Sequence, residues 1–222
     1  MNRILITGSS GFLGSQLTKH FSGLGFDVIG GKRANSDLWR LQGHLEKVRF
    51  VNLDEPGVLE NLFQETTVDL IIHTACAYGR AAHSELDVFK ANVELPVRLA
   101  NLARENGESV FINTDSFFAK PEFALGYMGA YVLSKRHCWD WLQLFRDDLK
   151  VINMRLEHVY GPQDDRSKFI SWVCEEFLAA NGEQRRIELS SCSQLRDFVY
   201  INDVVSAFEK VVRSVKSVSS GQ

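Results

Sequence analysis

A glycine-rich turn near the N-terminus constrains the fold of this chain more than any other feature. The turn follows the apolar run 4–6, which we interpret as a strand, and apolar residues then recur at helical spacing over 13–24. Glycines let the backbone turn tightly and approach a pyrophosphate, and a helix N-terminus attracts anions. The strand-turn-helix context favours a dinucleotide-binding turn over a purely structural one. The residues expected at the dinucleotide are Gly8, Ser10, Gly11, Phe12, Leu13 and Gly14.

Strand and helix patterns alternate through most of the chain. Further strands are predicted at 26–29, 48–51, 68–72, 110–113 and 151–154, and further helices at 56–63, 88–104 and 131–145. The last third differs, with predicted helices at 169–178 and 203–215 and short strands at 187–189 and 198–201. Alternation with short connections implies a parallel sheet covered on both faces. The predicted fold class is α/β, a Rossmann-type doubly wound parallel sheet.

Composition and charge exclude several classes of function. The net charge is -3, which argues against binding nucleic acid by bulk charge. No apolar run approaches the roughly 20 residues of a membrane span, and no signal peptide precedes the first strand. The four cysteines are scattered, without the paired spacing of a zinc site or a disulfide framework. We therefore expect no metal site, no membrane or nucleic-acid partner, and a cytoplasmic location.

The end of the second predicted strand bears on the choice of cofactor. Many dinucleotide-binding folds place an Asp or Glu there to bind the 2′-hydroxyl of NAD. This chain instead has Lys32 and Arg33 after two glycines. Cations suit the 2′-phosphate of NADP(H), and an Arg fork matches phosphate oxygens well. The pair favours NADP(H), with NAD(H) as the second choice, over the alternative of a solvated basic loop.

A second group of residues carries catalytic chemistry. Tyr131 and Lys135 are four residues apart and so share one face of a helix. A nearby ammonium favours the phenolate and lowers a tyrosine pKa. Thr114 is predicted where the fifth strand ends, at the edge of the sheet that lines the ligand crevice. Its hydroxyl could bind a substrate oxygen while Tyr131 moves the proton. A Tyr–Lys pair also occurs on solvated helices, so the threonine adds weight to the catalytic interpretation.

Taken together, the motifs resemble the extended short-chain dehydrogenase/reductase family, the NAD-dependent epimerase/dehydratase group that acts on nucleotide sugars. The matching segments are 7–14, Asp54, 73–76, 92–93, 113–115, 131–135, 155–162 and 196–203, in the family's order. The resemblance implies a catalytic trio of Thr114, Tyr131 and Lys135, with Asp54 near the adenine. Cofactor contacts are further implied at Leu53, Asp54, Ala75, Asn92, Tyr131, Lys135 and His158, the last as a pocket wall or a structural histidine.

Departures from the family pattern indicate which branch of the family the chain resembles. Sugar-nucleotide 4,6-dehydratases carry an Asp-Glu pair after the threonine, whereas this chain has Asp115 and Ser116. A serine cannot serve as a carboxylate base, so the dehydratase interpretation falls. The wider pattern is similar to the CDP-abequose/CDP-paratose synthase branch, whose members reduce a CDP-4-keto-dideoxyhexose with NADPH on the route to O-antigen sugars. Asp115 remains open as an acid/base residue or a turn stabiliser. Weaker substrate contacts are expected at Arg80, Asp115, Ser116 and Arg196.

The resemblance also sets expectations for domains and partners. Residues 1–160 are expected to form the NAD(P)-binding Rossmann domain. Residues 161–222 would form a partial substrate-binding region interleaved with it, truncated or naturally short beside the family's. The partners implied are a nucleotide-sugar substrate and a second copy of the chain, paired through helices near 90–104 and 131–147. A nucleotide-sugar 4-epimerase with retained NAD and a catalytically silent NADP-binding protein remain as alternative functions.

Overall fold

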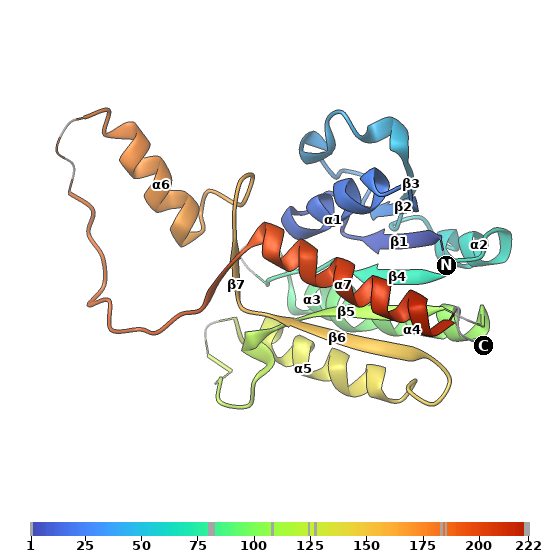
Figure 1. Cartoon of the computed structure of the whole chain (residues 1–222). Helices are drawn as coiled ribbons and strands as arrows, with labels where there is room; N and C mark the ends of the chain where they lie inside the picture. The colour runs from blue at the N-terminus through green and yellow to red at the C-terminus, as the bar shows by residue number, and fades with distance from the viewer. Residues whose placement is uncertain are drawn as a thin grey trace. The chain divides into compact units, whose positions relative to one another are not determined.

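The first of two compact units, residues 1–156, is built on a six-stranded parallel sheet (Figure 1). Its strands are β1 (Arg3–Thr7), β2 (Asp27–Lys32), β3 (Val48–Asn52), β4 (Leu70–His73), β5 (Val110–Ser116) and β6 (Lys150–Leu156). The order β3-β2-β1-β4-β5-β6 is that of a Rossmann sheet, so the predicted fold class is confirmed. The computed structural model describes residues 2–79, 83–107, 109–123, 125–126, 128–182, 184 and 186–219, with side chains up to residue 215.

Helices connect the strands and cover the sheet. They are α1 (Phe12–Gly23), α2 (Val58–Glu65), α3 (Glu85–Phe89), α4 (Leu95–Glu105) and α5 (Gly129–Gln143), with short 3₁₀ turns η1 (Trp39–Leu41), η2 (Leu45–Lys47) and η4 (Phe117–Ala119). The single helix predicted at 88–104 is wrong in detail. A π-helical turn, η3 (Lys90–Glu94), lies between α3 and α4. Such turns insert one extra residue per turn and often mark functional positions.

Burial on both faces explains why the strands read as continuous apolar runs. Ile4, Leu5 and Ile6 are all fully buried. Alternation sends Leu5 and its sheet neighbour Ile71 into the core formed with α2, α4 and α5. Parallel sheets are covered in this way on both sides, and a solvated face would instead have produced alternating polar residues. The sheet is therefore a rigid base from which the strand ends project.

The second unit, residues 157–222, is described by itself. It contains a two-stranded parallel pair and two helices: β7 (His158–Tyr160), β8 (Phe198–Tyr200), α6 (Phe169–Ala179) and α7 (Ile201–Ser219). The predicted strand at 187–189 is wrong. That segment is irregular, Leu189 is 51% exposed, and β8 pairs with His158–Tyr160 instead. No helix in the described part of the chain is both long and apolar enough to cross a membrane.

Candidate active site

The glycine turn is closely packed against the loop that follows β4. Gly8 has φ +69°, and a Cβ there would stand 2.7 Å from the Ala75 backbone. A Cβ on Gly14 would stand 2.7 Å from the Thr74 hydroxyl oxygen and against the Gly8 carbonyl. Helix α1 begins after Gly11 without a side-chain cap, so its first-turn N–H groups face the space beside the turn. The turn can therefore accept an anionic group against bare backbone.

Thr7 at the end of β1 fixes the start of the β4 loop. The Thr74 hydroxyl donates to the Thr7 carbonyl at 2.6 Å, and the Ala75 N–H donates to the Thr7 hydroxyl at 3.4 Å. The Thr7 hydroxyl also lies 2.8 Å from Nδ1 of His73, which is 1% exposed. Burial, assisted by the positive charge of Lys135, lowers the pKa of His73 to about 3. His73 is therefore neutral near pH 7 and serves to pack and hydrogen-bond the two strand ends.

The ends of β2 and β3 meet at the predicted adenosine side of the site. The Leu53 N–H donates to the Lys32 carbonyl at 2.7 Å, and the Asp54 carboxylate accepts from the Ala34 N–H at 2.8 Å. Lys32 directs its ammonium at the Arg33 carbonyl at 3.3 Å, and Arg33 is exposed. The structure thus brings Lys32, Arg33, Leu53 and Asp54 together, as the sequence predicts from their positions after neighbouring strands.

Thr114, Tyr131 and Lys135 converge beside the end of β5. Lys135 Nζ donates to the Thr114 carbonyl at 2.8 Å and lies 6.0 Å from the centre of the Tyr131 ring. Tyr131 is 5% exposed and Lys135 4%. The Thr114 hydroxyl oxygen is buried and has no hydrogen-bond partner among the described residues. A buried hydroxyl without a partner costs free energy, so its presence on the residue whose carbonyl binds the Lys135 ammonium indicates a position for a ligand oxygen.

The protonation of Tyr131 differs from the sequence-based expectation. Burial raises the pKa of the Tyr131 phenol, and a hydrogen bond with Ser116 opposes this without reversing it. Lys135 directs its ammonium at the Thr114 carbonyl, which leaves burial as the larger effect on the phenol. Burial would lower the pKa of Lys135, but its interactions with the Cys76 and Cys138 thiols, and then with the Asp115 carboxylate, offset this and the pKa is raised. The site therefore holds a neutral phenol and a charged ammonium.

Ser116 holds the Tyr131 phenol, a role that the sequence did not indicate. Its side chain hydrogen-bonds the Tyr131 phenol, and its oxygen accepts the Phe118 N–H at 3.3 Å. Ser116 is 8% exposed, so this bond is shielded from water. Thr114 and Ser116 lie on the same side of β5, because side chains two apart in a strand share a face. One hydroxyl thus holds the phenol while the other is left for a ligand.

Asp115 points to the opposite face of β5 and is fully buried. Its carboxylate accepts from Arg155 Nε and from Asn153 Nδ2, both at 2.9 Å. Asn113 donates to Asn153 at 2.8 Å on the same face, and strand register places 113 opposite 153 and 115 opposite 155. These contacts anchor β5 to β6. Both bonds to the carboxylate go to Oδ2, while Oδ1 is buried without a hydrogen-bond partner among the described residues, so the two roles expected for Asp115 both stay predictions.

Asn92, in the π-helical turn η3, holds the loop after β4 against α5. Its Oδ1 accepts from the Ala77 N–H at 2.8 Å, and its Nδ2 donates to the Ala77 carbonyl at 2.8 Å and to the Ser134 hydroxyl at 2.9 Å. Both amide hydrogens are therefore used within the protein. Ser134 in turn donates to the Tyr131 carbonyl at 2.8 Å. Asn92 thus connects the loop after β4 to α5, the helix that carries Tyr131 and Lys135.

Three predicted site residues remain, Arg80, His158 and Arg196. Arg80 is outside the described residues. His158 and Arg196 belong to the second unit. There the His158 N–H donates to the Asp197 carbonyl at 3.0 Å, and the Arg196 side chain is exposed and donates to the Leu195 carbonyl at 2.9 Å. Among the described residues, no three His, Cys, Asp or Glu side chains gather as metal ligands.

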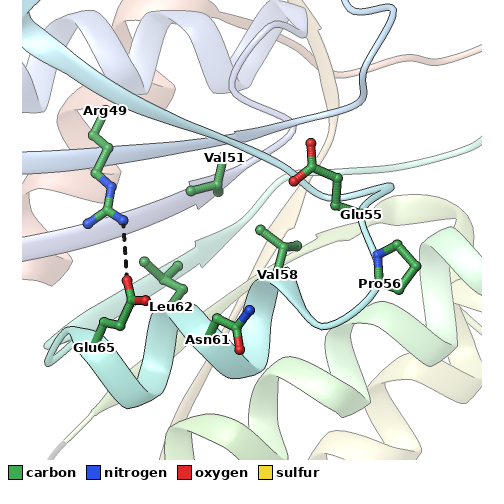
Figure 2. A pocket seen from close by; sticks show the side chains of 8 residues that line it. All are labelled: Arg49, Val51, Glu55, Pro56, Val58, Asn61, Leu62 and Glu65. Atoms are coloured by element: carbon green, nitrogen blue, oxygen red, sulfur yellow. Dashed lines mark ion pairs between the residues drawn. The ribbon is translucent and has the colours of Figure 1, made fainter.

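A small hollow lies beside β3 and α2, and Figure 2 shows the side chains that line it. Its volume is about 150 Å³. Arg49 faces Glu65 across it at 4.0 Å. The hollow is lined by Arg49, Val51, Glu55, Pro56, Val58, Asn61, Leu62 and Glu65, none of them a predicted site residue. The chemistry of the site therefore lies at the strand ends and not in this hollow.

The residues at the strand ends fit a nicotinamide dinucleotide. The glycine turn lies so close to the loop after β4 that a Cβ at Gly8 or Gly14 would collide with the protein itself, which keeps the turn as bare backbone. The uncapped start of α1 suits a pyrophosphate. Thr114 accepts from Lys135 through its carbonyl, and its hydroxyl oxygen is buried without a hydrogen-bond partner among the described residues. These features come from one edge of one sheet, where ligands of open α/β sheets bind.

Comparison with known proteins agrees with this geometry. Residues 4–222 match the model of the NAD dependent epimerase/dehydratase family. The chain is 34% identical to CDP-abequose synthase of Salmonella typhimurium over 224 residues, which cover 98% of this chain and 72% of that protein. A second CDP-abequose synthase, from Salmonella muenchen, is 35% identical over 95% of this chain and 70% of that protein.

Solved structures show the same fold. The ADP-L-glycero-D-manno-heptose-6-epimerase of Helicobacter pylori superposes with a TM-score of 0.76 at 26% identity, over 93% of this chain and 71% of that one. The Bordetella bronchiseptica enzyme WbmG in complex with NAD gives a TM-score of 0.75 at 22% identity, over 93% and 67%. With the family model matched from the first strand to the last residue, the chain belongs to the NAD dependent epimerase/dehydratase family and is an NAD(P)-dependent enzyme of the extended short-chain dehydrogenase/reductase type.

Proposed function

We propose that this enzyme uses NADPH to reduce the C4 ketone of a nucleotide-activated deoxysugar, of the CDP-4-keto-dideoxyhexose type, for O-antigen synthesis. The observation that carries the proposal is the buried Tyr131 phenol together with Thr114, whose carbonyl accepts from the Lys135 ammonium and whose buried hydroxyl lacks a partner among the described residues. Carbonyl reduction needs a proton donor and a second donor to the same oxygen, and these two groups supply both. The similarity to CDP-abequose synthases over nearly the whole chain supports the substrate class.

The glycine turn and the start of α1 would hold the cofactor's pyrophosphate, and the end of β2 would hold its adenosine. Lys32 and Arg33 stand there in place of the acidic residue that binds the ribose of NAD, which supports NADPH. Leu53, Asp54 and Ala75 would line the same side. When bound, a reduced nicotinamide supplies the hydride for the carbonyl carbon.

The chain's own residues handle the oxygen. The Thr114 hydroxyl donates a hydrogen bond to the ketone oxygen and orients it. The Tyr131 phenol then gives its proton to the same oxygen as negative charge develops there, and the ketone becomes an alcohol. Lys135 stays protonated, and its charge stabilises the phenolate left behind. Ser116 holds the phenol in line throughout.

Ser116 also separates this reaction from dehydration. A dehydratase needs a second carboxylate at the sugar, whereas Ser116 supplies only a hydroxyl that is already bonded to Tyr131. Asp115, the remaining acidic residue of this segment, is tied to Arg155 and Asn153 on the other face of β5. The site therefore supports proton delivery to one oxygen. Asp115 is paired with Arg155 and Asn153 through Oδ2 alone, and its Oδ1 is buried without a hydrogen-bond partner among the described residues.

The test combines turnover with cofactor binding. The full chain is mixed with NADPH and a panel of CDP-4-keto-6-deoxyhexoses, and loss of reduced nicotinamide is followed by absorbance. Tyr131→Phe should keep NADPH binding and lose turnover by roughly 100- to 10,000-fold. Undiminished turnover in that variant would remove Tyr131 from the mechanism. Tightly held oxidised cofactor after purification would instead support a 4-epimerase, and binding without turnover on any substrate would support a silent NADP-binding protein.

The proposal includes a cytoplasmic homodimer. Trp141 and Leu144, in and just after α5, are 51% and 70% exposed, and the four cysteines are free thiols. Exposed apolar side chains on one helix suit a contact with a second copy. Light scattering on the purified chain would give the oligomeric state, and a monomer at micromolar concentration would overturn this part of the proposal.

A further inference from the structure

Arg40 lies in the loop after β2, and its side chain contacts the glycine turn. The residue belongs to the 3₁₀ turn η1, thirty positions along the chain from Ser10. Its Nη1 donates to the Ser10 carbonyl at 3.4 Å. Its guanidinium carbon lies 4.4 Å from the centre of the Trp39 ring. Arg40 is thus placed at the edge of the turn that binds phosphate, with its side chain stacked on an aromatic ring.

The positive charge of Arg40 acts on Lys19 of α1. Lys19 of α1 has a lowered pKa, first because of partial burial and second because of the positive charge of Arg40. Two cations are therefore held close enough to repel each other, one on α1 and one on η1. An anion placed beside Arg40 would relieve that repulsion, so the local field favours a phosphate there.

The two cations predicted from the sequence are arranged differently. Lys32 directs its ammonium at the Arg33 carbonyl at 3.3 Å. The Arg33 backbone is held by Ser36, but its side chain is exposed. An exposed arginine loses rotamer freedom when it binds a phosphate. Arg40 is already ordered by Trp39 and Ser10, so less of that cost remains.

We propose that Arg40 is the main residue by which this enzyme recognises the 2′-phosphate of NADPH and so prefers it to NADH. The proposal rests on the NADPH-dependent function proposed above and names the residue responsible for it. A guanidinium carries five donors in a planar fork, which matches two phosphate oxygens at once. Lys32 and Arg33 then contribute through their charge near the site, and Arg40 through directed hydrogen bonds.

The test measures dissociation constants without turnover. NADPH and NADH are titrated against the wild-type chain by nicotinamide fluorescence, and then against Arg40→Gln, Arg40→Lys and the double variant Lys32→Gln/Arg33→Gln. Gln keeps a polar side chain but carries no charge. The Kd for NADPH should rise about 10- to 100-fold in Arg40→Gln, as expected for losing a charge-assisted pair of bonds, with NADH within twofold. The Kd of Arg40→Lys for NADPH should lie between those of the wild type and Arg40→Gln. The Kd of the double variant for NADPH should rise less than that of Arg40→Gln.

A matched control is Arg49→Gln, because Arg49 lies on β3 with an exposed side chain paired to Glu65 at 4.0 Å. It should leave both constants unchanged. The proposal is overturned if Arg40→Gln binds NADPH as tightly as wild type, or if the double variant loses more NADPH affinity than Arg40→Gln does. It is also overturned if Arg40→Gln binds NADPH and NADH more weakly by the same factor, because Arg40 would then only support the glycine turn. A wild-type chain that binds NADH as tightly as NADPH refutes the NADPH assignment itself, before any variant is compared.

Discussion

Asn92→Ala tests whether the π-helical turn supports the catalytic helix. In the native chain the Asn92 amide satisfies both backbone groups of Ala77, which is 4% exposed, and also bonds Ser134. The substitution removes all three bonds at once. Ser134 keeps its bond to the Tyr131 carbonyl, so the main loss falls on the N–H and the carbonyl of Ala77.

The magnitude follows from those two orphaned groups. Leaving a buried donor or acceptor unsatisfied costs about 1–3 kcal/mol, so two of them cost about 2–6 kcal/mol of unfolding free energy. Partial access of water to the loop after β4, where residues 74–76 are half-buried, favours the lower half of that range. Turnover should fall as well, because the loop and Tyr131 are no longer held together. We expect about 3 kcal/mol and a kcat reduced at least tenfold.

Urea unfolding followed by circular dichroism gives the free energy, and steady-state kinetics give kcat. Asn101→Ala is the matched control, since Asn101 on α4 is only partly buried, with its amide bonded to the Val97 carbonyl and to Arg104. It should cost under about 1 kcal/mol. A loss below about 1 kcal/mol in Asn92→Ala, or a kcat equal to wild type, would refute the role given to this residue.

Three further outcomes are expected. Gly14→Ala should raise the Kd for the dinucleotide about tenfold, because its Cβ would stand 2.7 Å from the Thr74 hydroxyl oxygen. Gly23→Ala is the control and should leave the Kd unchanged, since nothing lies within 4 Å of its Cβ. Equal Kd values for the two variants would refute the role given to the glycine turn. His73 has a folded pKa of about 3 against 6.5 unfolded, so its contribution is complete above pH 6.5 and is lost as the pH falls toward 3, at up to about 1.4 kcal/mol per unit. Urea unfolding at several pH values should show that slope in wild type and lose it in His73→Gln. Ser116→Ala should lower kcat roughly 2- to 12-fold without changing the Kd for NADPH, and an unchanged kcat would contradict the bond to Tyr131.

The sheet and the glycine turn were predictable because their signals are local. The run 4–6 and the glycines that follow it are adjacent in sequence, and buried parallel strands read as apolar runs. The predicted end of β5 at Asn113 is wrong by three residues. Asp115 and Ser116 are polar, yet they remain in the strand because β6 pairs with them through residue 156. A single sequence gives no signal that polar residues such as these belong to a strand and are buried by its neighbour.

The contacts that arrange the site were less predictable because they join distant residues. Thr114, Tyr131 and Lys135 were identifiable from their spacing and motif. The support from Asn92 depends on Ala77 and Ser134, which are 15 and 42 positions away. Arg40 gave no signal, because a basic residue in a loop of 3₁₀ turns has neither periodicity nor a motif. The pairing of Asp115 with Arg155 could have been found from strand alternation once β5 and β6 were known to be neighbours.

The central claim is that Tyr131 gives its proton to a sugar ketone held by Thr114. Its most direct test is oxidation of NADPH by CDP-4-keto-3,6-dideoxyhexose, measured for wild type, Thr114→Val and Tyr131→Phe after each variant is shown to bind NADPH. The account predicts turnover in wild type and a loss of at least about 100-fold in both variants at unchanged NADPH affinity. Equal turnover in the three proteins, or a folded wild type that binds NADPH and leaves the ketone unreduced, would contradict it.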